Sequence, residues 1–306
     1  MVLVSDIYQS RTDREAAIIK RQDPVVYPGP YEQGEFALSE HQLRGYRNNG
    51  FIQLRGLLHE SEAADLLQEA KTLVTASARE RRPEAVFESD GREVRSVFRG
   101  HELSSVFDRL MRDGRMLDVA RQILGSDVYI HQSRLNLKPG YAGKEFYWHS
   151  DFETWHVEDG MPRMRALSCV VLLDENNEFN APLMLVPGSH MHYIACIGQT
   201  PQDHYKKSLR RQEFGVPDPT SLGFLMERGG VQSAKGPAGS VLFFDCNMMH
   251  GSNGNISPYP RSNLFFVYNS VENRLESPQH GLQPRPEFIA ARSADLSLER
   301  VAPTPR

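Results

Sequence analysis

The chain has 306 residues, of which 40% are hydrophobic and 24% charged, and its formal net charge is −4 at pH 7. These values are typical of a soluble globular protein with a sizeable core, and they give no indication of a nucleic-acid partner, which would favour a basic protein. No stretch reaches the roughly 18 apolar residues typical of a membrane helix, and three widely spaced cysteines favour a reducing cytoplasm over a disulfide framework.

The N-terminal third of the chain combines an extended arm with helices. Residues 1–35 are polar and contain three prolines, which favours an arm that lies over the body of the protein. Ser39, with Gln42 three residues later, forms a capping-box pattern that predicts the start of a helix. The elements predicted after Ser39 are a helix over 40–48, a strand over 51–54, a helix over 61–79, a charged irregular segment over 80–100, and helices over 102–112 and 115–124.

Beyond residue 125 the pattern changes to short strands. Alternating segments bounded by Gly, Pro, Asn or Asp predict strands over 128–137, within 165–173, and over 183–186, 240–244 and 263–268. Strands that follow a helical third predict a mainly β fold with flanking helices, that is, a β-sandwich or jelly roll. Residues 195–235 are expected to form a long polar connection, and this connection and the arm are both candidate lids.

A histidine and a carboxylate stand two residues apart in the aromatic-rich run 146–156. The run predicts a strand and its exit, and residues i and i+2 of a strand point to one face, so His149 and Asp151 would project together. His250 follows another strand pattern 99 residues after Asp151 and supplies a third ligand. Two imidazoles and one carboxylate are the facial triad that holds Fe(II) and leaves positions open for oxygen chemistry.

The other histidines offer alternatives to this site. His-x-Asp spacing is common by chance, and a hydrogen-bonded histidine beside a solvated acid would explain it as well. His190 and His192 form a competing pair, although no acid lies close to them in the sequence. His156 is expected either to position a substrate or to cap a turn. Five further histidines are expected on the surface: His41, His59, His101, His204 and His280.

Arg261 follows His250 by eleven residues and stands at the start of a strand pattern. Its guanidinium matches a carboxylate with two parallel hydrogen bonds. An iron site that activates O2 needs electrons, which a 2-oxo acid supplies while it chelates the metal, and the distal carboxylate of that acid then needs a basic partner. Arg261 has the required chemistry, with Ser252 as a further donor; a surface arginine at a strand start is the alternative.

A set of motifs in the chain resembles those of the phytanoyl-CoA dioxygenase-like group of Fe(II)/2-oxoglutarate oxygenases: His149-x-Asp151, Pro187-Gly188-Ser189-His190, His250 and Arg261. The resemblance covers about residues 36–290. The longer run 146–162 is similar to the signature of the bacterial ectoine hydroxylases within this group. The resemblance implies a double-stranded β-helix (jelly-roll, cupin-like) core, and a homodimer in the bacterial cytoplasm. The implied division is an arm over 1–35, one oxygenase domain over 36–290 and a C-terminal tail over 291–306.

Carried over by position, the resemblance assigns a role to eleven residues. The iron ligands that it implies are His149, Asp151 and His250. The 2-oxoglutarate contacts that it implies are Asn136, Ser252 and Arg261. The ectoine contacts that it implies are Gln132, Trp155, Phe244, Asn263 and Phe265. On the strand pattern 128–137, Gln132, Arg134 and Asn136 share one face, which is compatible with a common cavity.

The implied activity is hydroxylation of ectoine to 5-hydroxyectoine, with O2 consumed and succinate and CO2 released, in compatible-solute synthesis for osmoprotection and the stress response. Aromatic faces favour a cation, so Trp155, Phe244 and Phe265 suit the amidinium of ectoine; core packing is the alternative for the two phenylalanines. Two other functions remain open: hydroxylation of another small substrate by the same chemistry, and a non-catalytic jelly-roll binding protein.

Overall fold

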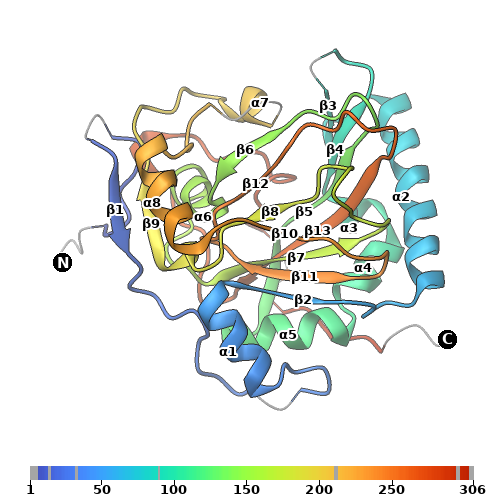
Figure 1. Cartoon of the computed structure of the whole chain (residues 1–306), viewed down its shortest axis with the longest axis horizontal. Helices are drawn as coiled ribbons and strands as arrows, with labels where there is room; N and C mark the ends of the chain where they lie inside the picture. Colours follow the sequence, from blue (N-terminus) through green and yellow to red (C-terminus); the bar gives the residue numbers. More distant parts are fainter. Residues whose placement is uncertain are drawn as a thin grey trace.

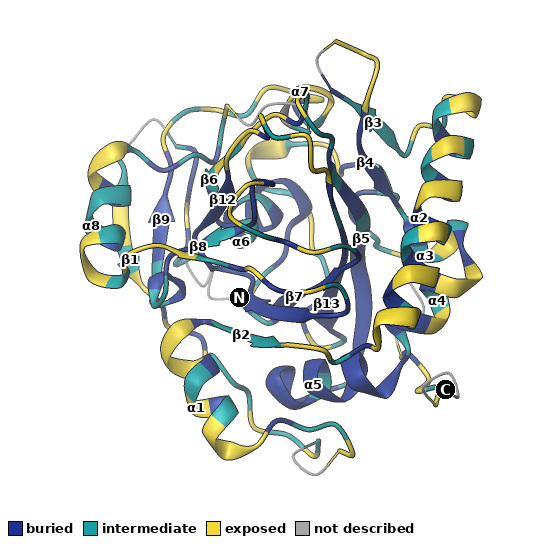
Figure 2. Ribbon diagram, turned by 45° about the vertical axis from the view of Figure 1, so that its right-hand side comes forward, coloured by how far each residue is buried: buried dark blue, intermediate teal, exposed yellow. Residues whose placement is uncertain are grey.

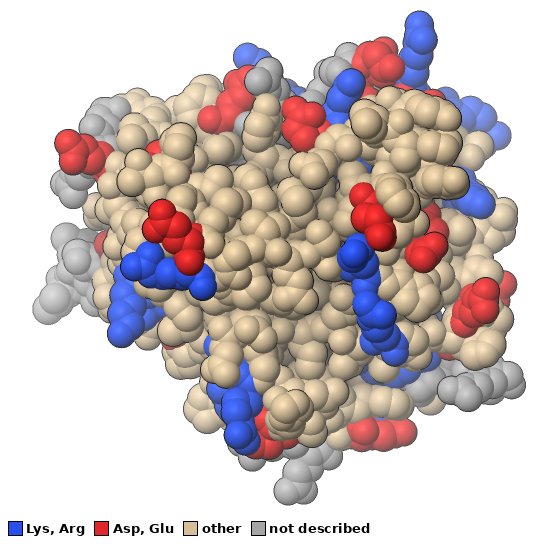
Figure 3. Space-filling view, viewed as in Figure 1, with Lys and Arg blue, Asp and Glu red and all other residues tan. Residues whose placement is uncertain are grey.

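The centre of the molecule is a pair of facing β-sheets, of seven and four strands, with helices on the outside (Figure 1). The computed structural model describes residues 6–12, 15–31, 34–88, 90–209, 213–293 and 297–302. This arrangement confirms the predicted mainly β fold with flanking helices and a jelly-roll core. The face seen in Figure 3 carries acidic and basic side chains intermixed among uncharged residues.

The seven-stranded sheet is antiparallel throughout its length. Its strands, in spatial order, are β2 (Phe51–Leu54), β11 (Val241–Asp245), β7 (Ala166–Leu172), β13 (Arg261–Ser270), β5 (Val128–Lys138), β4 (Val94–Phe98) and β3 (Ala85–Phe87). The prediction of an irregular segment over 80–100 is wrong, because this segment supplies β3 and β4. Their local sequence is charged, and they become strands by pairing with each other and with β5.

Helices cover the outer face of this sheet and bury an apolar cluster against it. They are α2 (Glu60–Glu80), α3 (Gly100–Leu103), α4 (Ser105–Met111) and α5 (Gly114–Leu124), and α5 is almost wholly buried (Figure 2). The helix predicted over 102–112 is divided at Ser104, whose hydroxyl accepts a hydrogen bond from the Phe107 amide and so caps α4. The covered outer face leaves the inner face free to build a site.

The four-stranded sheet faces the inner side of the larger sheet. Its order is β10 (Gln232–Ser233), β8 (Met184–Leu185), β12 (His250–Ser252) and β6 (Phe146–His149). Between the two sheets lies a second apolar cluster of nine buried residues: Val170, Leu172, Leu183, Leu185, Ala234, Leu242, Phe244, Met248 and Phe265. This cluster fixes the separation of the sheets, and therefore the position of β6 and β12 relative to β5 and β13.

The N-terminal region is built into the body. Strand β1 (Ala17–Lys20) pairs with β9 (His192–Ala195), and α1 (Glu40–Asn49) has the predicted capping box at Ser39. At the end of α1, Gly50 adopts a φ of 79°, and a Cβ there would lie 2.5 Å from the His190 ring, so glycine is required.

The segment 195–235 is not a continuous polar connection. It contains α7 (Tyr205–Ser208), α8 (Pro219–Gly229) and strand β10, and that expectation is therefore wrong in part. The described residues also form the short helix α6 (Asp151–Thr154), the π-helix η1 (Trp155–Asp159) and the 3-10 helices η2 (Ser189–Met191) and η3 (Gln279–Gly281). Among the described residues, no helix combines the length and apolar character that a bilayer span requires.

Candidate metal centre and pocket

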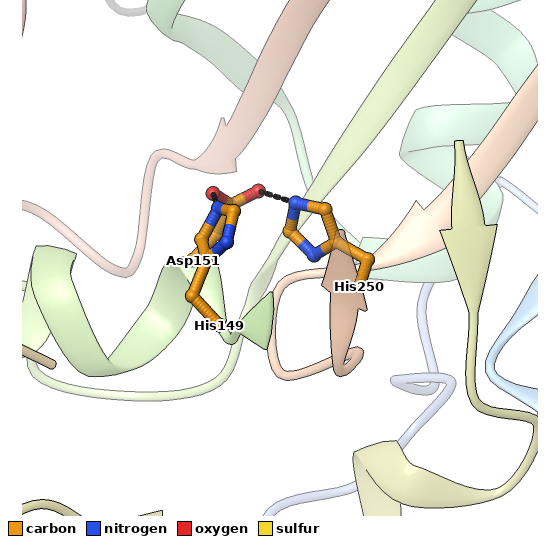
Figure 4. A group of neighbouring side chains, drawn as sticks. All are labelled: His149, Asp151 and His250. Atoms are coloured by element: carbon orange, nitrogen blue, oxygen red, sulfur yellow. Dashed lines mark ion pairs between the residues drawn. The ribbon is translucent and has the colours of Figure 1, made fainter. Parts of the chain in front are cut away.

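His149 and Asp151 lie on either side of a junction between a strand and a helix. His149 is the last residue of β6, Ser150 is extended, and Asp151 begins α6 (Asp151–Thr154). The prediction that both residues share one face of a strand is therefore wrong for Asp151. The chain turns at Ser150, and the carboxylate reaches the imidazole from the first turn of a helix (Figure 4).

His250 lies directly opposite His149 in the antiparallel pairing of β12 with β6. The two imidazole rings are 4.2 Å apart between centroids. The Nε2 atoms of His149 and His250 lie 3.7 Å and 3.9 Å from the two carboxylate oxygens of Asp151. In Figure 4 the three side chains point toward one another, and their ligand atoms all lie within 4.8 Å of each other. This spacing suits a single metal ion.

Both imidazoles are held in the tautomer that metal binding requires. His149 Nδ1 lies 2.6 Å from the Tyr147 carbonyl oxygen, and His250 Nδ1 lies 2.9 Å from that of Met248. Because a carbonyl oxygen only accepts, the neutral form of each ring carries its proton on Nδ1 and presents the Nε2 lone pair. Burial, together with the neighbouring His250, lowers the pKa of His149 to about 3, so its ring is neutral at physiological pH.

Among the described residues, these three side chains form the group of His, Cys, Asp or Glu that is close enough to hold a metal ion. His190 instead contacts the Arg47 carbonyl oxygen at 3.0 Å, and His192 packs against the Phe224 ring. His156 closes a turn by contacting the Met161 carbonyl oxygen at 2.7 Å. The surface expectation is wrong for His204, which is buried, and for His101, whose side chain is only 14% exposed.

The other predicted site residues lie mostly on the inner face of the seven-stranded sheet. Directly opposite residues on antiparallel strands share a face. The pairs along β5 and β13 are Gln132 with Val267, Arg134 with Phe265, Asn136 with Asn263, and Lys138 with Arg261. One face of two strands therefore carries three cationic side chains, three amides and a phenyl ring.

Arg261 is a buried cation with an unused donor. Its Nη1 donates to the Ala181 carbonyl oxygen at 2.8 Å, and its Nη2 donates to Asn136 Oδ1 at 2.8 Å. Its Nε has no acceptor among the described residues, and none of their carboxylates is paired with it. Burial lowers the pKa of Arg261 to about 10, so it stays charged at neutral pH. A buried, unpaired guanidinium is a strong site for an anion. Arg261 is thus no surface arginine.

Ser252 and Asn136 are already engaged by these cations. Lys138 Nζ donates to Ser252 Oγ at 3.0 Å, and Asn136 Oδ1 accepts from Arg261. The two predicted co-substrate contacts therefore adjoin the cationic side chains. The sequence did not single out Lys138, because a lysine at a strand end usually reaches solvent.

The pocket beside the metal cluster contains two of the predicted substrate contacts, Gln132 and Trp155. It is lined by Ser96, Phe98, Gln132, Arg134, Phe146, His149, Asp151, Thr154, Trp155, Glu158, Leu209, Phe214 and Arg285. Arg134 forms no hydrogen bond or ion pair with any described residue, although its guanidinium lies over the Phe265 ring, 5.0 Å from the centroid. Burial lowers the pKa of Arg134, and the Asp151 charge opposes this. Arg134 is therefore a free cation in the pocket wall.

The other three predicted substrate contacts, Phe244, Asn263 and Phe265, are buried and are not among the residues that line this pocket. Both side-chain polar atoms of Asn263 are buried without a partner among the described residues, which is unusual outside a binding site. Phe244 packs against the His250 ring, with centroids 5.0 Å apart, and Phe265 underlies Arg134. Both phenylalanines also belong to the cluster between the sheets, so the alternative of core packing holds for them as well.

The sequence matches one protein family and is similar to curated members of it. Residues 46–263 match the family model of phytanoyl-CoA dioxygenase. The chain is 60% identical to the ectoine dioxygenase of Bordetella bronchiseptica over 291 residues, which cover 94% of this chain and 93% of the relative.

The chain also resembles solved structures of EctD. One is EctD from S. alaskensis with 2-oxoglutarate and 5-hydroxyectoine; it is 46% identical, superposes with a TM-score of 0.87, and the match covers 97% of this chain and 99% of that one. EctD from S. alaskensis with bound Fe is 45% identical, with a TM-score of 0.86 and the same coverage.

Proposed function

The chain belongs to the phytanoyl-CoA dioxygenase family, and we propose that within it this protein hydroxylates ectoine to 5-hydroxyectoine. The reaction uses Fe(II), 2-oxoglutarate and O2, and releases succinate and CO2. One observation carries the proposal: two imidazoles and a carboxylate converge beside buried, unpaired cations, in a chain that matches an ectoine dioxygenase over 94% of its length. The rival of a non-catalytic binding protein does not explain this combination.

His149, Asp151 and His250 are the proposed ligands of the iron. They fit it because the Nδ1 contact of each imidazole leaves its Nε2 directed toward the Asp151 carboxylate, in a buried setting. Iron bound there supplies activation of O2, driven by oxidative decarboxylation of the 2-oxo acid. The role of the protein is to orient both organic substrates and to exclude water.

Arg261 is the proposed partner of the distal carboxylate of 2-oxoglutarate. Its free Nε–H donor and its unpaired charge support this role, and Ser252 and Asn136 adjoin it. A dicarboxylate would give the buried guanidinium a direct ion pair, which the described residues do not provide, since Asp174 acts on it only as a nearby charge. A 2-oxo acid without a distal carboxylate would leave the guanidinium unpaired.

The ectoine pocket is proposed to use both ends of the zwitterion. Arg134 is the cation free to take the ectoine carboxylate, because it lines the pocket and is not paired. The faces of Trp155, Phe244 and Phe265 suit the delocalised amidinium. Gln132 and Asn263 supply uncharged hydrogen-bond partners, and the two unpartnered polar atoms of Asn263 support its part in this pocket.

The decisive experiment is an assay of the purified protein with Fe(II), 2-oxoglutarate, O2 and ectoine. The expected product is heavier than ectoine by one oxygen atom, and it forms with an equal amount of succinate. Turnover of another small molecule without turnover of ectoine would favour the same-family alternative. No turnover and no metal binding would favour the non-catalytic alternative.

We also propose a homodimer in the bacterial cytoplasm, and a role in osmoprotection under stress through compatible-solute synthesis. The bacterial ectoine dioxygenases that the chain matches support these proposals. Light scattering coupled to size-exclusion chromatography tests the dimer, and a mass equal to the 34.7 kDa of one chain would contradict it.

A further inference from the structure

Arg11 of the N-terminal arm has a fully buried side chain, and each of its five N–H donors has an acceptor. Its Nε and Nη2 donate to the two oxygens of Glu153, and its Nη1 donates to Glu158. The second hydrogens of Nη1 and Nη2 are directed to Thr200 Oγ1 at 2.8 Å and Thr154 Oγ1 at 3.1 Å. One guanidinium therefore joins a helical segment to a loop that lies far from it in the sequence.

The two carboxylates that Arg11 binds lie on either side of Trp155, five residues apart. In an α-helix, with 3.6 residues per turn, positions five apart point about 140° away from each other. The chain instead changes from α6 to the π-helix η1 at Trp155, and hydrogen bonds in a π-helix join residues i and i+5. This wider turn brings Glu153 and Glu158 to the same guanidinium. The ion pairs thus hold together the turn that carries Trp155.

The turn held by Arg11 forms part of the pocket wall beside the metal cluster. Thr154, Trp155 and Glu158 all line that pocket. The Trp155 side chain is buried, and its ring meets the His131 ring edge-on, with centroids 5.1 Å apart. Two of the three lining residues are direct partners of Arg11, which does not itself line the pocket.

A second part of the pocket wall also contacts Arg11. Phe214 lines the pocket from the chain that follows β9. The Arg11 amide donates to the Cys196 carbonyl oxygen at 2.8 Å, so the arm lies along the start of this chain. Gly215, next to Phe214, has a φ of 69°, and a Cβ there would lie 2.5 Å from Arg11 Nη2. Gly215 therefore packs directly against the guanidinium.

We propose that Arg11 is a positioning residue for the substrate pocket: it fixes the π-helical turn that presents Trp155, and it anchors the neighbouring wall at Phe214. The proposal rests on the proposed function, since it takes ectoine as the ligand of this pocket. The side-chain hydrogen bonds described for Arg11 do not reach β5, β12 or β13, which carry the proposed 2-oxoglutarate contacts. Replacement of Arg11 is therefore expected to weaken ectoine binding and to leave 2-oxoglutarate binding unchanged.

The test compares Arg11→Lys with Arg115→Lys. Lysine keeps the charge, but its three donors share one nitrogen and cannot match five acceptors. Arg115 is the matched control, because it is also buried and also pairs with two carboxylates, those of Glu62 and Asp113. These residues belong to the helical layer on the outer face of the large sheet. Both variants should therefore lower the free energy of unfolding, and only Arg11→Lys should affect the pocket.

The first measurement is ligand affinity. Ectoine binding is measured by calorimetry in oxygen-free solution on protein loaded with Fe(II) and 2-oxoglutarate, and 2-oxoglutarate binding is measured on protein loaded with Fe(II). Arg11→Lys should weaken ectoine binding roughly tenfold or more, the scale of a hydrogen bond to a charged group. It should leave the affinity for 2-oxoglutarate unchanged, and Arg115→Lys should change neither affinity.

The second measurement is the fluorescence of Trp155, which needs no ligand. The chain has two tryptophans, Trp148 and Trp155, so Trp155 is the sole indole in a Trp148→Phe background. A buried indole emits at a shorter wavelength than a hydrated one. In folded protein, Arg11→Lys should shift the emission of Trp155 to longer wavelength, and Arg115→Lys should leave it in place.

The other outcomes separate this proposal from the proposed function. Either unchanged ectoine affinity or unchanged Trp155 emission in Arg11→Lys overturns the role of Arg11 and leaves the proposed function standing. Equal weakening of ectoine binding by Arg11→Lys and Arg115→Lys, or of both ligands by Arg11→Lys, indicates general destabilisation and also overturns it. If the wild-type protein binds no ectoine, the proposed function is contradicted, and the emission of Trp155 alone decides the role of Arg11.

If Arg11→Lys does not fold, Thr200→Val is measured in the same way. This variant keeps both ion pairs of Arg11 and removes one of its hydrogen bonds to the pocket loop. It should weaken ectoine binding several-fold, and an unchanged affinity would overturn the proposal.

Discussion

The Arg11 guanidinium forms a bidentate ion pair with the Glu153 carboxylate, with Nε 3.0 Å from Oε1 and Nη2 2.8 Å from Oε2. Both side chains are buried, with exposed fractions of 0% and 2%. Arg11 also pairs with Glu158 of η1. Because Glu153 belongs to the helix that begins with Asp151, the N-terminal arm is attached directly to the element that carries the proposed carboxylate ligand.

Replacement of Arg11 by Met should destabilise the protein. It leaves two buried carboxylates with fewer partners, and breaking a buried ion pair typically costs about 3–5 kcal/mol. Urea denaturation measures the free energy of unfolding. The control is Arg79→Met, because the Arg79 side chain is 78% exposed. A change equal to that of the control would contradict a structural role for the arm.

Replacement of Asp151 by Ala should abolish turnover and weaken metal binding. Loss of a hydrogen-bond partner of a metal ligand usually lowers affinity 10–100-fold, so loss of the ligand itself should lower it by roughly 100-fold or more. Equilibrium dialysis of Fe(II) under anaerobic conditions measures the affinity. Asp65→Ala, at an exposed position of α2, is the matched control. Undiminished Fe(II) binding by Asp151→Ala would remove Asp151 from the ligand set.

Replacement of Arg134 by Gln should raise the KM for ectoine roughly 10–100-fold, because a charge-assisted hydrogen bond to the substrate carboxylate contributes about 1.5–3 kcal/mol. The KM for 2-oxoglutarate should change much less. Steady-state kinetics with each substrate varied in turn separates the two effects. A larger change for 2-oxoglutarate than for ectoine would place Arg134 at the co-substrate instead.

The free energy of unfolding should decrease as the pH is lowered, because His101, a residue outside the pocket, becomes protonated. Burial lowers the pKa of His101 to about 4, and its Nδ1 lies 2.6 Å from Ser133 Oγ. The unfolded chain, with a histidine pKa near 6.5, then binds more protons than the folded one between these values. His101 therefore contributes stability fully above about pH 6.5, and this contribution, on the order of 2–3 kcal/mol, is lost as the pH falls toward 4.

His101→Gln should reduce this slope of unfolding free energy against pH, and His41→Gln, at an exposed position, should keep it. The contribution of Asp174 to stability depends on pH in the opposite direction. Burial raises the pKa of Asp174 to about 6, so its contribution is lost as the pH rises through 6. All three proteins contain Asp174, so its effect cancels in the difference. Parallel curves for wild type and His101→Gln would contradict the prediction.

Local patterns were sufficient to predict much of the fold. The capping box at Ser39 and the alternation along 128–137 act over a few residues, and both produced the expected elements. Strands β3 and β4 were missed because their charged sequences become strands only through pairing with each other and with β5. The helix that begins at Asp151 was missed because the aromatic run before it is typical of a strand.

The candidate site likewise contains residues that the sequence could predict and residues that it could not. Residue type and spacing were enough to single out His149, Asp151 and His250, and the structure brings them together. The contacts of Arg11 and Lys138 were not predictable, because they depend on partners far away in the sequence. Arg11 meets Glu153 across 142 positions, and Lys138 meets Ser252 across 114. Whether a cation is paired depends on the completed fold.

The pairing of β6 with β12 has a consequence for how such a protein can diverge. His149 and His250 are cross-strand neighbours, so their separation is set by one rung of a backbone ladder and not by the hundred or so residues between them. Loops within that interval are free to lengthen, shorten or be exchanged without moving the two proposed ligands. Leu209 and Phe214, which line the pocket, belong to this interval. Substrate choice can therefore evolve, or be engineered, by loop grafting while the metal chemistry is inherited unchanged.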